Sequence, residues 1–259
     1  MPSKILLFDI ENAPSSAYIW SLYQEVVSED MLGVPWYILC WSAKWLGSKE
    51  VMSSALIDFP SEYKKNPEND KLALKKLWAL LDEADIVIAH NGKQFDVRKI
   101  NARFIMNGMP PPSPYKVVDT LLAARQYFFF TSNKLTDLGK YLKCGEKMET
   151  GGFKLWRDCM AGNKKAWRKL VKYCRNDILL LEKIYLKLRP YILNHPATNI
   201  YGAGENGACP RCGSKSATRQ GFSYTATAKY QRFRCNKCYG WFRTTGNCKD
   251  KSIVETRNV

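Results

Sequence analysis

The sequence contains no long hydrophobic run, and this absence excludes one class of protein. No apolar stretch approaches the ~20 residues that a membrane-spanning helix needs, so we expect no membrane partner. The N-terminus carries one lysine before an apolar run and no cleavage site, so we also expect no signal peptide. Repeats and low-complexity tracts are absent as well. The 259 residues, 46% of them hydrophobic, predict one sizeable core and a small appendage.

Cysteine is too sparse for a disulfide scaffold, with nine residues in the whole chain. Four of them form two Cys-x-x-Cys pairs, Cys209 with Cys212 and Cys235 with Cys238, separated by 22 residues. This spacing matches a structural zinc site of four thiolates on a ribbon of β-hairpins. Paired disulfides or free thiols are the alternatives. Cys248 is not expected to bind, because four thiolates complete the tetrahedron.

The same cysteine usage favours a reducing compartment, so we expect a cytoplasmic protein, with a phage or a bacterium as candidate sources. Acidic residues are also fewer than basic ones, 24 against 40, which gives a net charge of +16. Such an excess predicts a polyanionic partner, and nucleic acid is the leading candidate.

Half of the excess charge lies in the last quarter of the chain. From residue 200 onward there are eleven Lys and Arg against three Asp and Glu, a net charge of +8. Aromatic residues alternate with the basic ones, which predicts phosphate contacts and base stacking on a single strand. Arg232 and Arg234 are the candidate contacts. The alternative is that most of these aromatic residues form the small core of the ribbon.

Short apolar, aromatic or β-branched runs alternate with helical periods along the first 190 residues. The runs predict strands over residues 4–12, 17–25, 36–44, 51–59, 85–89 and 117–119. Helical spacing predicts helices over residues 72–81, 121–127, 135–142 and 164–188, and one after residue 96. Residues 61–70 are expected to form a polar loop. A helix between two buried strands favours parallel pairing and an α/β core.

Glycine and proline then mark a change of composition. They predict a core domain over residues 1–190, a linker over residues 191–207 and the zinc ribbon over residues 208–259.

Two acids stand at the end of the first predicted strand. Side chains alternate along a strand, so Asp9 and Glu11 share one face while Phe8 and Ile10 share the other. Two like charges so close together repel unless a cation lies between them. A pair of carboxylates suits Mg²⁺ or Mn²⁺. The alternative is that Glu11 begins a solvated turn and Asp9 is a cap.

Other acids follow at ligand-binding places. Asp96 is expected in the first turn of a helix at the carboxyl edge of the sheet, where α/β proteins place ligands; the alternative is a favourable interaction with the helix dipole. Asp177 and Tyr173 are four residues apart on the long helix, hence neighbours beside its apolar stripe. The alternative partner of Asp177 is a distant lysine or arginine. We interpret Asp119 as a cap.

Three segments carry these acids: Phe8-Asp-Ile-Glu11, His90-Asn-Gly-Lys-Gln-Phe-Asp96 and Tyr173-Cys-Arg-Asn-Asp177. In order and spacing they resemble the motifs of the DEDD superfamily of 3′→5′ exonucleases, and the resemblance covers the first 190 residues. It implies an RNase H-like fold, a mixed sheet flanked by helices. The tyrosine places the chain with the tyrosine subclass, because neither His90 nor His195 can occupy the position that defines the histidine subclass.

The resemblance also implies roles for these residues. Asp9 would bridge two Mg²⁺ or Mn²⁺ ions, with Glu11 and Asp177 at one of them and Asp96 at the other, partly through water. Tyr173 would orient the attacking water. Asn91 would shape its turn or contact the terminal nucleotide, and Lys93 is a further candidate for substrate binding.

The sequence thus predicts a metal-dependent 3′→5′ exonuclease acting on single-stranded ends, of DNA in preference to RNA. It would hold two divalent ions and one zinc ion, and it could serve a replication or repair complex. The alternatives are a structure-specific endonuclease on the same fold, a catalytically silent nucleic-acid-binding protein, and an adaptor whose ribbon binds protein.

Overall fold

The computed structural model describes residues 3–23, 26–201 and 207–248. It contains two compact units, an N-terminal unit over Lys4–Tyr185 and a C-terminal unit that begins at Leu186. In the described part of the chain, no helix is both long enough and apolar enough to cross a membrane.

A mixed sheet forms the centre of the N-terminal unit. In spatial order its strands are β5 (Met52–Ala55), β4 (Ile38–Trp45), β1 (Ile5–Asn12), β6 (Ile86–Ala89) and β7 (Lys116–Asp119). The β5–β4 and β4–β1 pairs are antiparallel, whereas the β1–β6 and β6–β7 pairs are parallel. This arrangement confirms the mixed α/β sheet and the parallel pairing of the strands at 4–12 and 85–89.

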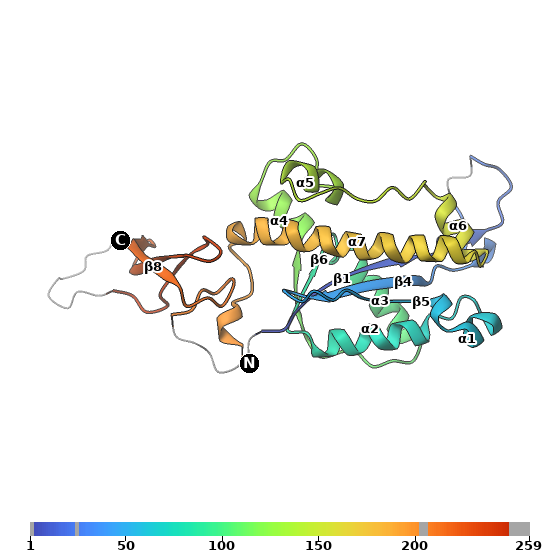
Figure 1. Cartoon of the computed structure of the whole chain (residues 1–259), viewed down its shortest axis with the longest axis horizontal. Coiled ribbons are helices and arrows are strands. Elements are labelled where there is room, and N and C mark those ends of the chain that lie inside the picture. The colour runs from blue at the N-terminus through green and yellow to red at the C-terminus, as the bar shows by residue number, and fades with distance from the viewer. Residues whose placement is uncertain (1–2, 24–25, 202–206, 249–259) are drawn as a thin grey trace. The chain divides into compact units, whose positions relative to one another are not determined.

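Helices cover both faces of this sheet (Figure 1). One face carries α2 (Lys71–Glu83) and α3 (Asp96–Met106), and the other carries α7 (Lys164–Leu188). Phe8 and Ile10 belong to the core cluster that contains apolar residues of α2 and α3. The second cluster contains Trp167, Leu170 and Cys174 of α7. The alternation along β1 therefore directs Asp9 and Glu11 to the side of α7.

Several predicted helices form as expected. They are α2, α7, α4 (Thr120–Tyr127) and α5 (Leu135–Tyr141). Two further helices were not predicted: α1 (Pro60–Lys65), inside the predicted polar loop, and α6 (Lys154–Met160). Proline at the first position of α1 has a φ angle that already suits a helix, which explains why a polar, proline-containing segment is helical there.

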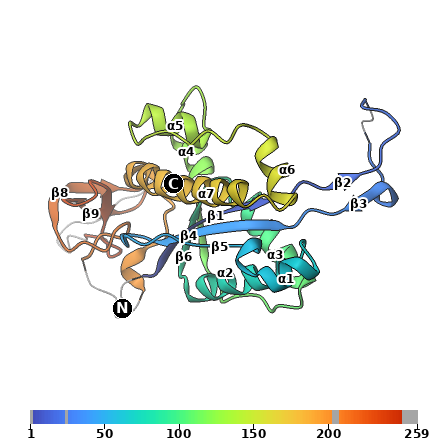
Figure 2. The same ribbon diagram turned by 45° about the vertical axis from the view of Figure 1, so that its right-hand side comes forward.

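The predicted strand over residues 17–25 is wrong. Only β2 (Ser16–Ala17) is extended, and it pairs with β3 (Leu32–Val34) in a separate small sheet (Figure 2). Residues 24 and 25 lie outside the described residues. The aromatic residues of this segment are exposed, Trp20 to 96%, so its composition does not reflect a place in the core.

The predicted strand over residues 51–59 is too long. Strand β5 ends at Ala55, and a 3-10 helix (Leu56–Asp58) follows. The Asp58 carboxylate accepts a hydrogen bond from the backbone N–H of Ala55 at 2.8 Å, which closes this turn.

The C-terminal unit contains an antiparallel sheet in the order β10 (Trp241–Arg243), β9 (Lys229–Cys235) and β8 (Ala217–Tyr224). Part of the segment predicted as a linker packs within this unit. The Arg211 guanidinium donates to the carbonyl of Ile192 at 3.1 Å, and the N–H of Thr198 donates to the carbonyl of Pro210 at 2.7 Å.

Candidate active site

Three of the predicted acids meet between β1 and α7. One carboxylate oxygen from each of Asp9, Glu11 and Asp177 lies within 4.8 Å of the others. Two come from adjacent same-face positions of β1, and the third comes from the facing helix. The convergence requires β1 to pack under α7, as the core clusters show.

The fourth acid approaches from α3. Asp96 is the first residue of that helix and is 3% exposed. Its Oδ1 accepts a hydrogen bond from the backbone N–H of Ile10 at 3.2 Å. Ile10 stands between Asp9 and Glu11 in the sequence, so this bond holds the Asp96 carboxylate against β1. Asp96 therefore lies against the strand that carries Asp9 and Glu11, close enough for its charge to raise the pKa of Asp9.

Burial and mutual repulsion make these carboxylates resist ionisation. Burial raises the pKa of Asp9 well above its ordinary value, and the charges of Asp96, Glu11 and Asp177 raise it further. Burial also raises the pKa of Glu11 to about 8 and that of Asp96 to about 7. The pKa of Asp177 is raised by the same cause. Ionising all of these carboxyl groups at neutral pH is therefore unfavourable unless positive charge binds among them.

The site fits a divalent cation. Asp177 Oδ1 is buried and has no hydrogen-bond partner among the described residues. A buried carboxylate oxygen without a partner is costly, and a bound cation would satisfy it. Carboxylate oxygens from three elements are the hard donors that Mg²⁺ and Mn²⁺ prefer.

Tyr173 lies beside the acids, and a lysine that sequence reasoning missed holds it there. The Lys147 ammonium is 2.6 Å from Asp177 Oδ2 and donates to the Tyr173 hydroxyl at 2.8 Å. Burial disfavours the charged form of Lys147, but Asp177 and Tyr173 outweigh it and raise its pKa above the usual value. Nothing in the sequence marks this lysine, because it is one of 40 basic residues and belongs to no periodic pattern.

Trp156 of α6 is a second residue that the sequence did not reveal. Its ring packs edge-on against Tyr173, with centroids 6.2 Å apart, and its side chain is close enough to Glu11 to favour the ionised carboxylate. Burial and the charge of Asp177 raise the pKa of Tyr173 to about 12, so its hydroxyl is protonated at neutral pH. Lys147 and Trp156 thus fix the position of a neutral phenol next to the acids.

The loop before α3 is held by Asp119. Its carboxylate accepts the N–H groups of Asn91 and Lys93, both at 3.0 Å, and it also caps α4, as predicted. Asn91 has a φ angle of 66°, a conformation that most residues avoid. At Gly92 a Cβ would lie 2.3 Å from the Cβ of Ala89, so this turn requires glycine. The Lys93 side chain is exposed.

The four paired cysteines gather in the C-terminal unit, with all four sulfur atoms within 4.8 Å of one another. The Sγ atoms of Cys209 and Cys238 are 3.7 Å apart, and those of Cys212 and Cys235 are 3.6 Å apart. Zn–S bonds of about 2.3 Å in a tetrahedron place the sulfur atoms about 3.8 Å apart. The cluster therefore fits zinc. Cys248 is exposed and is not part of the cluster.

Arg232 and Arg234 lie on one face of the same sheet, in register with Arg243 and Trp241 of β10. Their guanidinium carbons are 4.9 and 5.9 Å from the centre of the Trp241 ring. Alternation along β9 directs Phe233 to the other face. There it stacks on Phe242, a residue packed against the cysteine cluster. Aromatic residues thus serve both as core and as exposed surface.

The comparisons with known proteins agree with this fold. The sequence matches the family model of the RNase H superfamily over residues 45–189. No curated protein matches it.

Among solved structures, the family B DNA polymerase from the hyperthermophilic archaeon Pyrobaculum calidifontis is similar, with a TM-score of 0.53 and 12% sequence identity. The match covers 74% of this chain but 26% of the polymerase, so the chain spans about a quarter of that protein's length. At this identity the likeness is one of fold. The matched family model spans more than half of the sequence, and the chain belongs to the RNase H superfamily.

Proposed function

We propose that this protein is a metal-dependent 3′→5′ exonuclease of the DEDD superfamily, tyrosine subclass, acting on single-stranded DNA ends. The observation that carries the proposal is the convergence of Asp9, Glu11 and Asp177 on one point, with Tyr173 beside them. The superfamily membership supports a phosphodiester substrate, and the net charge of +16 supports a nucleic-acid partner.

Each acid has a definite role in this proposal. Glu11 and Asp177 would hold one divalent ion, Asp96 would hold a second, and Asp9 would contribute to both. When bound, the two ions supply electrostatic stabilisation of the attacking and leaving oxygens. The raised pKa values mean that proton loss from these acids accompanies ion binding.

Tyr173 positions the attacking water. A phenol with a pKa of about 12 is a poor base at neutral pH, so the hydroxyl acts by orientation. Because its oxygen accepts a hydrogen bond from Lys147, its own proton is directed elsewhere, toward Asp177 or the water. Lys147 is therefore a positioning residue for Tyr173.

Other residues would bind the strand. In the N-terminal unit, Asn91 and Lys93 flank the site on the loop before α3, and Phe95 exposes part of its ring next to Asp96. In the C-terminal unit, which we propose is a zinc ribbon, Arg232 and Arg234 already stack on aromatic rings. Guanidinium groups fixed in this way suit phosphate contacts, and exposed rings suit base stacking.

The polarity of cleavage tests the proposal. Linear single-stranded DNA and RNA labelled at the 5′ end, and a circular single strand, are incubated with Mg²⁺ or Mn²⁺. We expect a ladder that shortens stepwise from the 3′ end of the DNA, no cleavage in chelator, and intact circles. Cleavage of the circles would instead identify an endonuclease.

The contact between Lys147 and Tyr173 leads to a prediction of coupling. Tyr173→Phe is expected to lower kcat by about 10²-fold, the scale of positioned acid–base groups, with little change in KM. Lys147→Met should have a similar effect, because the hydroxyl loses the donor that orients it. Since the two act as one unit, the double variant should be scarcely worse than either single one.

The four proteins are compared by single-turnover kinetics on one oligonucleotide. Tyr185→Phe, a buried tyrosine twelve residues further along α7, is the matched control and should keep its activity. If the loss of activity in the double variant equals the product of the losses in the two single variants, the positioning role of Lys147 is contradicted.

A further inference from the structure

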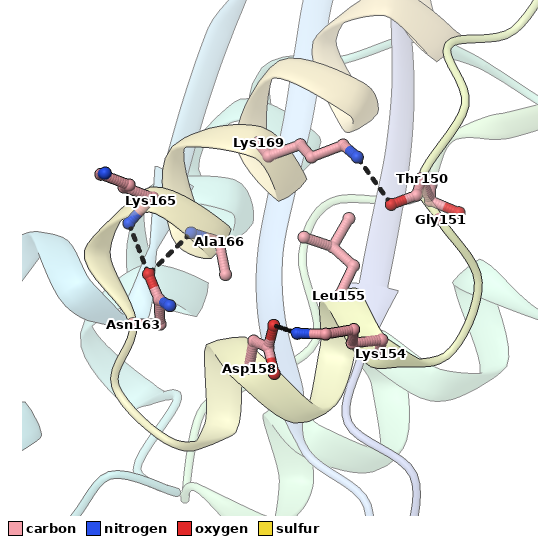
Figure 3. Close-up of a pocket in the computed structure, with 9 residues that line it drawn as sticks. All are labelled: Thr150, Gly151, Lys154, Leu155, Asp158, Asn163, Lys165, Ala166 and Lys169. Carbon is pink, nitrogen blue, oxygen red and sulfur yellow. Dashed lines mark hydrogen bonds and ion pairs between the residues drawn. The ribbon is translucent and has the colours of Figure 1, made fainter.

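A surface pocket of about 330 Å³ lies in the N-terminal unit outside the acidic site (Figure 3). It is bounded by the segment around Thr150, by α6 and by the first turns of α7. A water molecule occupies about 30 Å³ in the liquid, so the pocket has room for roughly ten of them or for a phosphate group with some solvent. Three lysines line it, Lys154, Lys165 and Lys169, against one acid, Asp158.

The start of α7 is unusually basic. Between residues 164 and 175 the helix carries six Lys and Arg and no acid. Its first turn also contains no acid. Positive side chains at a helix N-terminus oppose the helix dipole and lower stability, whereas an acid there would raise it. This pattern is unfavourable for the isolated helix and becomes favourable when an anion lies beside it.

Two of the three lysine amino groups that line the pocket have partners in the protein. Lys169 donates to the carbonyl of Thr150 at 2.8 Å, and Lys154 is 2.5 Å from the Asp158 carboxylate. Figure 3 shows these two contacts on either side of Leu155. The Asn163 side chain already accepts the N–H groups of Lys165 and Ala166, so the helix backbone is capped. An anion would therefore be held by the lysine amines.

The residues that line the pocket are neighbours in sequence of residues beside the acidic site. Lys169 precedes Tyr173 by four residues, so the two are neighbours on one face of α7, about 6 Å apart along the axis. Thr150 follows Lys147 by three residues, and Leu155 is adjacent to Trp156, which contacts Tyr173 and Glu11. A strand that leaves the acids along α7 would therefore meet Lys169 about one helical turn from Tyr173.

We propose that this pocket binds a backbone phosphate of the substrate strand, one or two nucleotides away from the cleaved bond. The inference rests on the proposed function, because it takes the strand to be cleaved at the acids. A phosphate could also come from the released mononucleotide, and the experiment separates the two sources.

Binding is measured in chelator, without hydrolysis, by fluorescence anisotropy of labelled single-stranded DNA on the full chain. The double variant Lys154→Gln/Lys169→Gln removes two positive charges from the pocket. The control, Lys183→Gln/Lys187→Gln, removes two exposed lysines of the same helix about 21 Å or more further along its axis. We expect the pocket variant to bind about 10-fold more weakly than wild type and control. Its log–log salt dependence should be shallower by about 0.7 per phosphate released.

Strand length identifies the source of the phosphate. Under cleavage conditions, the KM of the pocket variant should rise for strands of four or more nucleotides. It should stay at the wild-type value for a dinucleotide, whose one phosphate is at the cleaved bond. Inhibition by free mononucleotide should be unchanged.

Equal affinity and equal salt dependence for the pocket variant and the control would overturn the inference. So would an effect confined to mononucleotide inhibition, which would assign the pocket to the product. The binding measurement needs no metal, so it tests the pocket even if the protein does not cleave DNA. Absence of cleavage would disprove the proposed function only.

Discussion

Replacing Asp9 by alanine is expected to abolish hydrolysis, lowering the rate by about 10³-fold or more, while the protein stays folded. In the proposed site Asp9 would hold both ions, and loss of several kcal/mol of electrostatic stabilisation corresponds to this factor. The measurement is release of labelled nucleotide with saturating Mg²⁺. Activity near that of wild type would contradict the two-ion site.

The same substitution should stabilise the metal-free protein above pH 5. In the folded state the pKa of Glu11 is about 8 and that of Asp96 about 7, against ordinary values of about 4. At pH values between the unfolded and the folded pKa, the folded state binds more protons than the unfolded state. The free energy of unfolding therefore falls as the pH rises. Asp9→Ala removes one of the repelling charges. In chelator, its thermal midpoint should therefore decline less from pH 5 to pH 8 than that of wild type.

A second buried aspartate is a matched control, for which the expected change in stability has the opposite sign. Asp70 is fully buried, accepts the N–H of Ile38 at 3.0 Å and pairs with Arg103 at 2.7 Å. Asp70→Ala leaves that arginine without its partner, so it should destabilise the protein by about 3 kcal/mol or more. If both variants lose stability alike in chelator, the acids of the site are structural.

Loss of zinc is expected to unfold the C-terminal unit and spare the nuclease chemistry. Binding of structural zinc supplies about 10–16 kcal/mol to small domains, and the rest of this unit's core is small, with Phe242 packed against the cysteines. Cys235→Ser should therefore remove bound zinc and the cooperative unfolding of this unit. KM on long single strands should rise by about 10²-fold through lost avidity, whereas cleavage of very short oligonucleotides should hardly change.

Zinc content by mass spectrometry, with KM against strand length, measures both parts of this prediction. Cys248→Ser changes an exposed thiol outside the cluster and should behave as wild type. A Cys235→Ser protein that lacks zinc but binds long strands normally would mean that the unit does not contact nucleic acid. Its basic and aromatic face would then need a protein partner.

The placement of the acids followed from two periodicities in the sequence. Alternation along β1 put Asp9 and Glu11 on one face, and a separation of four residues put Tyr173 and Asp177 on one helical face. Both rules are local, so they hold whatever the rest of the chain does. The positions of two further acids were also predicted: Asp119 caps α4, and Asp96 lies in the first turn of α3.

The residues that were missed depend on contacts between distant segments. Lys147 reaches Tyr173 from a loop, and Trp156 reaches Glu11 from a helix of seven residues with little periodicity. The prediction of a strand over residues 17–25 was wrong for another reason. The aromatic side chains of this segment are exposed, and composition alone does not distinguish an exposed surface from a buried strand.

Binding of Mn²⁺ to the full, zinc-loaded chain tests the central claim most directly, because it detects the proposed ions without assuming a substrate. Calorimetric titration at neutral pH should show two ions per chain, proton release on binding, and an increase in thermal midpoint. Asp9→Ala should lose this binding, whereas Asp137→Asn, an acid of α5 outside the site, should keep it. Mn²⁺ binding that is absent from wild type, or equal in wild type and Asp9→Ala, would contradict a metal centre at these acids.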